Sequence, residues 1–132
     1  MDFIATTRAE DANGDLGPNQ GVTRFLTYQD AARKRLSDTD WASAVLRAAG
    51  SNPVVIHVHG YNLTHQEALV RLRDFAAGLR AAGFAGTTVG FDWPANGATL
   101  AYRKDRADAQ AIAPELVLRV IGAIPAKAQI KR

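Results

Sequence analysis

Two short polar segments of this sequence combine residue types that could do chemistry at the end of a strand. They are His59-Gly60-Tyr61-Asn62 and Asp92-Trp93. Because glycine has no side chain, the backbone near Gly60 can approach a ligand closely, and the amides that follow can point into a cleft. Preorganised amides stabilise the negative oxygen of a tetrahedral intermediate, and losing one such donor costs about 2.7–4 kcal/mol. The first segment therefore predicts half of an oxyanion hole.

Each polar segment follows an apolar run that predicts a strand. Residues 54–58 are mostly β-branched, and residues 87–92 form the next such run. Between them, Thr64 and Glu67 form a capping box that starts a helix, and Gly83 ends it. Strands in such a βαβ unit are parallel, and ligands bind beyond their carboxyl ends. We therefore expect both polar segments at the same end of a sheet.

The flanking sequence predicts further elements with weaker patterns. Residues 100–124 are mostly helical, although Pro114 should kink or divide that helix. Upstream we expect strands at 3–7 and 23–28, a loop at 10–21, and a short helix at 40–49. The fold class expected is α/β, a mostly parallel sheet with flanking helices. It forms one domain over residues 1–132, with N-terminal strands and a short helix in 1–50 and a βαβα unit in 51–132.

The composition is that of an ordinary globular protein. Of the 132 residues 47% are hydrophobic and 22% charged, and the net charge is +3. This small charge, without interleaved aromatics or a phosphate-binding glycine loop, argues against nucleic-acid and nucleotide binding. There is no cysteine, no stretch of about 20 apolar residues, and no basic and apolar signal sequence. We expect a cytoplasmic protein without a membrane span or cofactor.

The pair His57 and His59 has a metal-binding alternative. Residues two apart on a strand share a face, and imidazoles bind divalent metals. However, no further ligand follows at the spacing of a zinc hydrolase, and His65 falls on the first turn of the next helix. We therefore expect no metal site, with His59 shaping the strand end and His57 buried.

Residues 54–113 resemble a group of bacterial α/β-hydrolases of uncharacterised function, which are serine esterase- or lipase-like. The resemblance rests on an ordered set of motifs: His59-Gly60-Tyr61-Asn62, Asp92-Trp93-Pro94, Tyr102 and Asp105-Arg106. Residues 5–8 are also similar to the first strand of that family. The resemblance implies that the amides after the first motif form the oxyanion-hole side of an ester-hydrolysing site.

The sequence departs from this family after its last motif. The relatives continue into another strand with a serine elbow, followed by the acid and the histidine of the triad. The serines of this chain are Ser37, Ser43 and Ser51, all upstream of the first motif. We therefore expect a partial α/β-hydrolase fold that lacks the nucleophile strand and everything after it. Nucleophile, acid and base are absent, so no catalytic residue is assigned.

Every candidate site residue also has a plain structural alternative. Tyr61 could line an acyl pocket or pack over the strand end, and Asn62 could orient the loop or serve as a turn residue. Asp92 could face the cleft or pair with a nearby arginine, and Trp93 is more typical of a core. Arg106 belongs to a charged helix face, although the resemblance raises the chance that it faces the cleft.

Two functions compete on this sequence. The first is an esterase- or lipase-like hydrolase domain that is inactive as this isolated chain and takes a small-molecule ester only if missing segments complete it. The second is a non-catalytic interaction protein, because a sheet that stops before its nucleophile strand exposes an unpaired edge. In that case we expect homo-oligomers formed through the edge.

Overall fold

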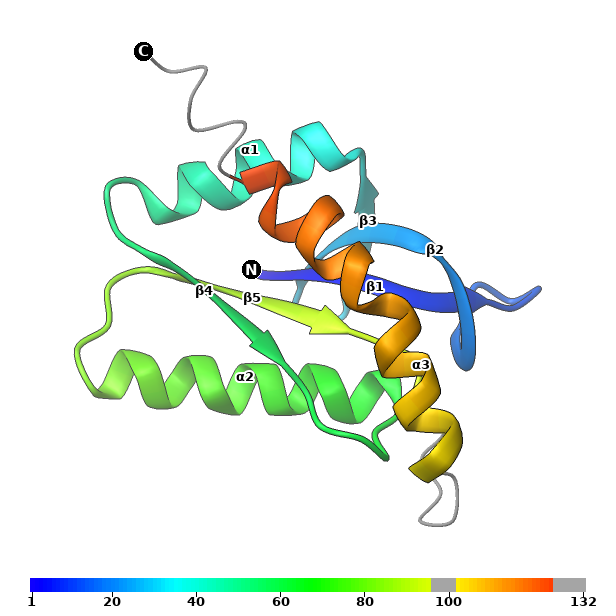
Figure 1. The fold of residues 1–132 in the computed structure, drawn as a ribbon. Helices are drawn as coiled ribbons and strands as arrows, with labels where there is room; N and C mark the ends of the chain where they lie inside the picture. Colours follow the sequence, from blue (N-terminus) through cyan, green and yellow to red (C-terminus); the bar gives the residue numbers. More distant parts are fainter. Residues whose placement is uncertain (96–101, 125–132) are drawn as a thin grey trace.

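The computed structural model describes residues 1–95 and 102–124. The strands are β1 (Asp2–Glu10), β2 (Leu16–Gln29), β3 (Ala32–Leu36), β4 (Val54–Val58) and β5 (Thr87–Asp92). The helices are α1 (Asp38–Ala49), α2 (His65–Ala81), α3 (Tyr102–Glu115) and the π-helix η1 (Leu116–Ile121). The strands form one sheet in the order β3-β2-β1-β5-β4 (Figure 1).

The expectation of a mostly parallel sheet is wrong, because the sheet is mixed. Strand β5 pairs in parallel with β1 and β4, whereas β2 is antiparallel to both β1 and β3. Short turns explain the antiparallel half, since a chain that reverses within a few residues can only place the next strand antiparallel. The parallel half follows the predicted strand–helix–strand unit, with α2 as the crossover between β4 and β5.

The expected loop at residues 10–21 is mostly strand. Only residues 11–15 form the turn, where Asp11 Oδ1 accepts hydrogen bonds from the amides of Asn13 (2.8 Å) and Asp15 (2.9 Å). Pro18 lies where the register between β1 and β2 is irregular, so its missing amide breaks no regular ladder. Glycine and proline therefore mark an irregular strand here, and no separate sequence pattern indicates β3.

The predicted helix starts are present with their caps. Ser37 Oγ accepts from the amide of Asp40 (3.1 Å) at the start of α1. At the start of α2, Thr64 and Glu67 make both bonds of the predicted capping box. Because α2 follows β4 within a few residues, this cap also fixes where the intervening loop ends.

The predicted division of the C-terminal helix occurs close to Pro114. This proline lies inside α3, and the π-helix η1 begins two residues later. A proline cannot donate the bond that would close the preceding turn, which favours a change of helix type. Residues 100 and 101 of the expected helix lie outside the described residues. Among the helices in the described part of the chain, none has the length and apolar character needed to cross a membrane.

The sheet has a hydrophobic core on each face. On one face Phe3, Trp41 and Phe91 pack with α1, α3 and η1. On the other face Ile4 and Leu26 of the sheet pack with Leu72 of α2. The packing on this face is close, because a Cβ on Gly90 of β5 would lie 2.8 Å from Leu72 Cδ2 and the leucine would have to move. Figure 1 shows α2 below the sheet and α1 above it.

Candidate functional site

The two polar segments meet at the carboxyl ends of β4 and β5. His59 follows β4, and Asp92 is the last residue of β5. Their side chains are in contact, with His59 Nε2 3.0 Å from Asp92 Oδ1. Parallel pairing of the two strands produces this meeting, because it brings both carboxyl ends to one edge of the sheet.

Asp92 is the centre of a buried polar network. Only 2% of the residue is exposed. Each of its two carboxylate oxygens accepts two side-chain hydrogen bonds. Oδ1 accepts from Arg8 Nε (2.7 Å) and His59 Nε2 (3.0 Å), and Oδ2 accepts from Thr6 Oγ1 (2.9 Å) and His65 Nδ1 (2.7 Å). We call Asp92, these four partners and Tyr28 the Asp92 cluster. A carboxylate this well paired can stay charged in the interior.

The electrostatics of the cluster favour a charged Asp92. Burial raises the pKa of this carboxyl, but the hydrogen bonds from His59 and His65 and the charge of Arg8 outweigh burial. The pKa of Asp92 is therefore held well below its usual range.

The cluster extends through His65 to Tyr28. His65 Nδ1 donates to Asp92, so in the neutral ring Nε2 is the acceptor, and the Tyr28 hydroxyl 2.7 Å away donates to it. Burial raises the pKa of the Tyr28 phenol, which keeps this hydroxyl protonated. The Asp–His–hydroxyl order is that of a catalytic triad. Here, however, the hydroxyl belongs to a tyrosine that is only 6% exposed, so the chain of bonds serves to fix the fold.

Arg8 connects the cluster to three segments of backbone. Its guanidinium donates to the carbonyls of Leu63 (2.7 Å), Ala95 (3.3 Å) and Gly17 (3.3 Å) in addition to Asp92. Only 1% of Arg8 is exposed. One side chain on β1 therefore holds the loop after β4, the segment after β5 and the start of β2 in place.

The loop that Arg8 holds, residues 60–63, contains two costly features. Asn62 has a φ of 66°, in the left-handed region, and its Oδ1 is buried without a hydrogen-bond partner among the described residues. Each feature costs of order 1–3 kcal/mol, and such strain concentrates at ligand sites. Gly60 is exposed, and a Cβ added to it would meet nothing within 4 Å. Tyr61 is 53% exposed. The loop is thus held by Arg8 on its buried side and exposed to solvent at Gly60 and Tyr61.

Trp93 closes the core side of the site. Its indole is stacked on the His59 ring, with centroids 5.5 Å apart and planes 4° apart. Its Nε1 donates to the His59 carbonyl (2.9 Å), and the residue is only 6% exposed. Trp93 is therefore a core residue that fixes His59 rather than a platform for a ligand.

Other predicted residues lie apart from the Asp92 cluster. Arg106 is exposed on α3, and its place in a cleft stays a prediction. His57 is half-buried rather than buried, and its ring lies against Phe75, with centroids 4.8 Å apart. Burial, and then the nearby charge of His59, lower the pKa of His57.

The serines of the chain lie far from the strand ends just described. Ser37 caps α1, and Ser43 Oγ donates to the carbonyl of Thr39 (2.8 Å) within the same helix. Ser51 precedes β4 at its amino end. None of the three lies at the carboxyl end of the parallel strands, where the loop at residues 60–63 lies.

Four members of the cluster were not predicted from sequence patterns. These are Thr6, Arg8, Tyr28 and His65. The available signal was weak: Thr6 and Arg8 are polar residues two apart in a strand, so they share a face. A polar pair on a buried strand needs hydrogen-bonding partners. The polar residues at the ends of the predicted strands, His57, His59 and Asp92, were the candidates.

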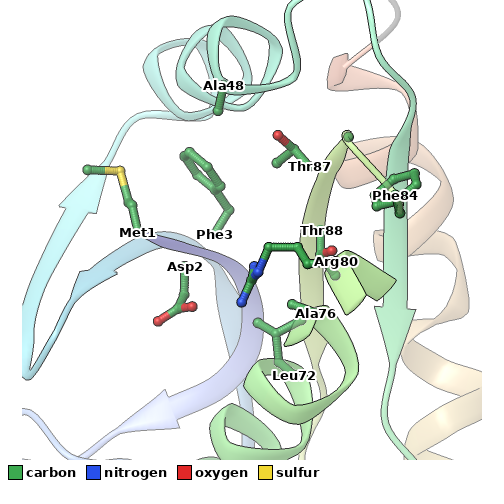
Figure 2. A pocket seen from close by; sticks show the side chains of 11 residues that line it. Met1, Asp2, Phe3, Ala48, Leu72, Ala76, Arg80, Phe84, Thr87 and Thr88 are labelled. Carbon is green, nitrogen blue, oxygen red and sulfur yellow. The ribbon is translucent and has the colours of Figure 1, made fainter. Parts of the chain in front are cut away.

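A pocket of about 270 Å³ lies at the opposite, amino-terminal end of the parallel strands (Figure 2). Phe3, Leu72 and Ala76 form its apolar side, with Asp2 and Arg80 among its polar residues. Its lining includes no serine, histidine or tyrosine. It therefore offers no serine nucleophile and no histidine base, and the carboxyl end remains the candidate site.

The described residues offer no metal centre. Within residues 1–95 and 102–124, no group of three or more histidines and carboxylates is placed to hold a metal ion. At the one place where two histidines and a carboxylate meet, His59 and His65 bond directly to Asp92, and Arg8 supplies the positive charge.

The βαβ unit, in which β4 leads into a His-Gly loop beside the end of β5 at Asp92, places the chain in the α/β class of folds. The chain belongs to the family described as "Alpha/beta hydrolase of unknown function (DUF900)", whose model matches residues 34–132. No curated protein and no solved structure matched the chain in the other two comparisons. The family therefore gives the fold class and leaves the reaction to be inferred from the site.

Proposed function

We propose that this chain provides the oxyanion-hole side of a serine carboxylic-ester hydrolase of the esterase or lipase type. The observation that carries the proposal is the loop at residues 60–63. It follows a parallel strand, Arg8 anchors it through the Leu63 carbonyl at 2.7 Å, and Asn62 is held in a strained conformation. Fixed backbone amides above a strand end are what stabilisation of an oxyanion requires.

We also propose that the isolated chain does not turn over esters. Its three serines lie on or beside α1, away from the loop, and no nucleophile–histidine pair faces the loop within the described residues. A complete hydrolase that loses its triad keeps about 10³–10⁴-fold catalysis over water from its oxyanion hole and binding pocket. Without the opposite wall of the pocket, less than this remains. A small ester is therefore a ligand only of a completed site.

The first test is an assay of the pure chain with p-nitrophenyl acetate. We expect hydrolysis at the rate of buffer alone and no mass increase after treatment with a serine-directed fluorophosphonate. Turnover well above buffer that survives the inhibitor would contradict the proposal and require a different site.

The second test completes the site in trans. The carboxyl-terminal half of a longer member of the family, which carries the serine, acid and histidine, is mixed with the chain and assayed with the same ester. We expect activity in the mixture, lowered at least about tenfold by Gly60→Ala because the new Cβ narrows the space for the substrate. Gly78→Ala is the matched control, since a Cβ there also meets nothing within 4 Å but lies on α2. Equal activity of both variants would remove the loop from the mechanism.

A second candidate function is a non-catalytic interaction through the sheet edge. The observation that favours it is that β4 pairs with β5 on one side and has no partner on the other among the described residues. An unpaired strand offers a row of backbone donors and acceptors to another strand.

A further inference from the structure

The pocket at the amino-terminal end of the parallel strands contains a positive charge without a counterion. Arg80, near the end of α2, lines this pocket and makes no ion pair within the described residues. The carboxylate in the lining, that of Asp2, is already held by Arg73, whose Nε lies 2.9 Å from Oδ2. Figure 2 shows the Arg80 side chain directed toward Asp2. These three groups leave one positive charge in excess, which favours a bound anion.

The end of α2 fixes this arginine and an aromatic ring at the same pocket. The amide of Gly83 donates to the Arg80 carbonyl (3.0 Å), and the amide of Phe84 donates to the Leu79 carbonyl (2.9 Å). These two bonds form a Schellman motif, which ends a helix with a residue in the left-handed region. Gly83 takes that position with a φ of 89°. The turn therefore brings Phe84 back to the pocket that Arg80 lines before the chain enters β5.

The segment between α2 and β5 is closely packed at Gly86. A Cβ added to Gly86 would lie 2.0 Å from the Pro53 carbonyl oxygen and 2.4 Å from Phe84 Cζ. The Thr87 amide donates to the same carbonyl (3.1 Å). A larger residue at position 86 would therefore have to displace backbone or the Phe84 ring. This wall of the pocket is thus formed by the fold itself, as is usual for small-molecule sites.

The rest of the lining offers an apolar surface. Phe3, Leu72 and Ala76 contribute from the sheet and from α2, and Ala48 contributes from α1 (Figure 2). The volume of about 270 Å³ lies just below the range of about 300–1,000 Å³ that is typical of pockets for drug-sized ligands. The pocket therefore suits a small molecule that has an apolar part and a negative charge.

We propose that this pocket binds a small monocarboxylate, with its carboxylate on Arg80 and its apolar tail against the lining. Arginine binds carboxylates through two parallel hydrogen bonds, which adds orientation to charge. A monoanion matches the single charge in excess, whereas the two charges of a phosphate would exceed it and lie close to Asp2. The inference is independent of ester hydrolysis, because the pocket lies at the opposite end of the strands from the loop at residues 60–63.

The first experiment titrates the chain with hexanoate and follows the backbone amide signals by NMR. We expect saturable shifts confined to residues 2–3, 72–80 and 84–88. Arg80→Ala should weaken binding at least about tenfold, because hydrogen bonds to a charged group are lost. The matched control is Arg71→Ala, since Arg71 is also exposed on α2 but lies outside the pocket lining, and this variant should bind like the parent.

Both arginine variants should fold like the parent, because the replaced side chains are exposed. Weaker binding by Arg80→Ala is therefore not a loss of fold, and urea unfolding of both variants checks this. Equal binding by the two variants would overturn the proposal. Shifts that spread over the surface without saturation would overturn it as well.

The second experiment separates the charge of the ligand from its shape. Hexanamide has the same tail as hexanoate but no charge, so it should bind the parent at least about tenfold more weakly. Hexanamide should also bind the parent and Arg80→Ala equally. An amide that binds the parent as well as the acid does would exclude an anion site.

The third experiment fills the pocket from α1. Ala48→Leu adds apolar volume at an exposed position of the lining, so hexanoate should bind at least about tenfold more weakly. Ala77→Leu is the matched control, since Ala77 is exposed on α2 and lies outside the lining. Full binding by Ala48→Leu would show that the ligand lies elsewhere and would overturn the proposal.

Discussion

The two ends of the parallel strands in this chain are built on opposite principles. At the carboxyl end the buried charges of Arg8 and Asp92 bond to each other and to the loops around them. At the amino end lies an open pocket, where the exposed Arg80 makes no ion pair within the described residues (Figure 2). The difference indicates that the fold fixes its geometry where the loops meet and tolerates change at the other end.

The sharpest way to break this comparison is Asp92→Asn. The substitution leaves the Arg8 charge buried without its counterion, which costs about 3–5 kcal/mol of unfolding free energy. Urea unfolding of the variant beside the parent measures this loss. Asp74→Asn is the control, because Asp74 is exposed on α2 and its replacement should change stability by less than about 0.5 kcal/mol. Similar losses in the two variants would show that the Asp92 cluster is not special.

Acid should remove the same contribution from the natural chain. The pKa of Asp92 is lowered in the native state, so its stabilisation is complete above about pH 4, the ordinary pKa of an aspartate. As the pH falls further, the unfolded chain binds the proton first, and stability is lost until native Asp92 is protonated too. The difference in unfolding free energy between the parent and Asp92→Asn should therefore narrow below about pH 4. A constant difference down to about pH 2 would contradict this.

A smaller effect is expected from Tyr28→Phe. The change removes the hydroxyl 2.7 Å from His65 Nε2 and leaves that buried nitrogen without its partner, at a cost of about 1–3 kcal/mol. In a double-mutant cycle, this loss and that of Asp92→Asn should be non-additive, because both residues bond to His65. Simple additivity would show that Tyr28 does not act through the cluster.

The smallest effect is expected at the amino end. Arg80→Ala should change the unfolding free energy by less than about 0.5 kcal/mol, because the side chain is exposed. Arg8→Ala, which removes an arginine of the same chemistry from the other end, should cost several times more, because it leaves Asp92 buried without its ion pair. Equal losses in these two variants would remove the distinction between the ends.

Local sequence patterns predicted much of the parallel half of the fold. The β-branched run of β4, the capping box of α2 and the change of helix near Pro114 all depend on residues close in the chain. Strand β3 escaped prediction because Arg33, Lys34 and Arg35 interrupt any apolar alternation, although their charges suit an exposed edge. The polar stretch of β2 has the pattern of a loop for a similar reason, because its glycines and Pro18 interrupt any alternation.

The site was predicted in part, because only some of its residues belong to one local βαβ unit. His59 and Asp92 follow strands of one βαβ unit, so topology alone brings them together. Thr6 and Arg8 lie more than 80 residues from Asp92, and no local spacing connects them. The conformation of Asn62 was equally hidden, because a positive φ depends on how the loop is anchored at both ends.

The central position of β1 has a consequence for the order of assembly during synthesis. Its antiparallel partner β2 follows it directly, but its parallel partner β5 is the last of the five described strands to be synthesised. Arg8 and Asp92 are 84 positions apart, so the nascent chain can form the β1–β2–β3 meander while Arg8 still waits for its counterion. Contacts of such long range close slowly. The first of the five described strands is thus among the last to be completed, and its side facing β5 stays unpaired until residue 92 has been made.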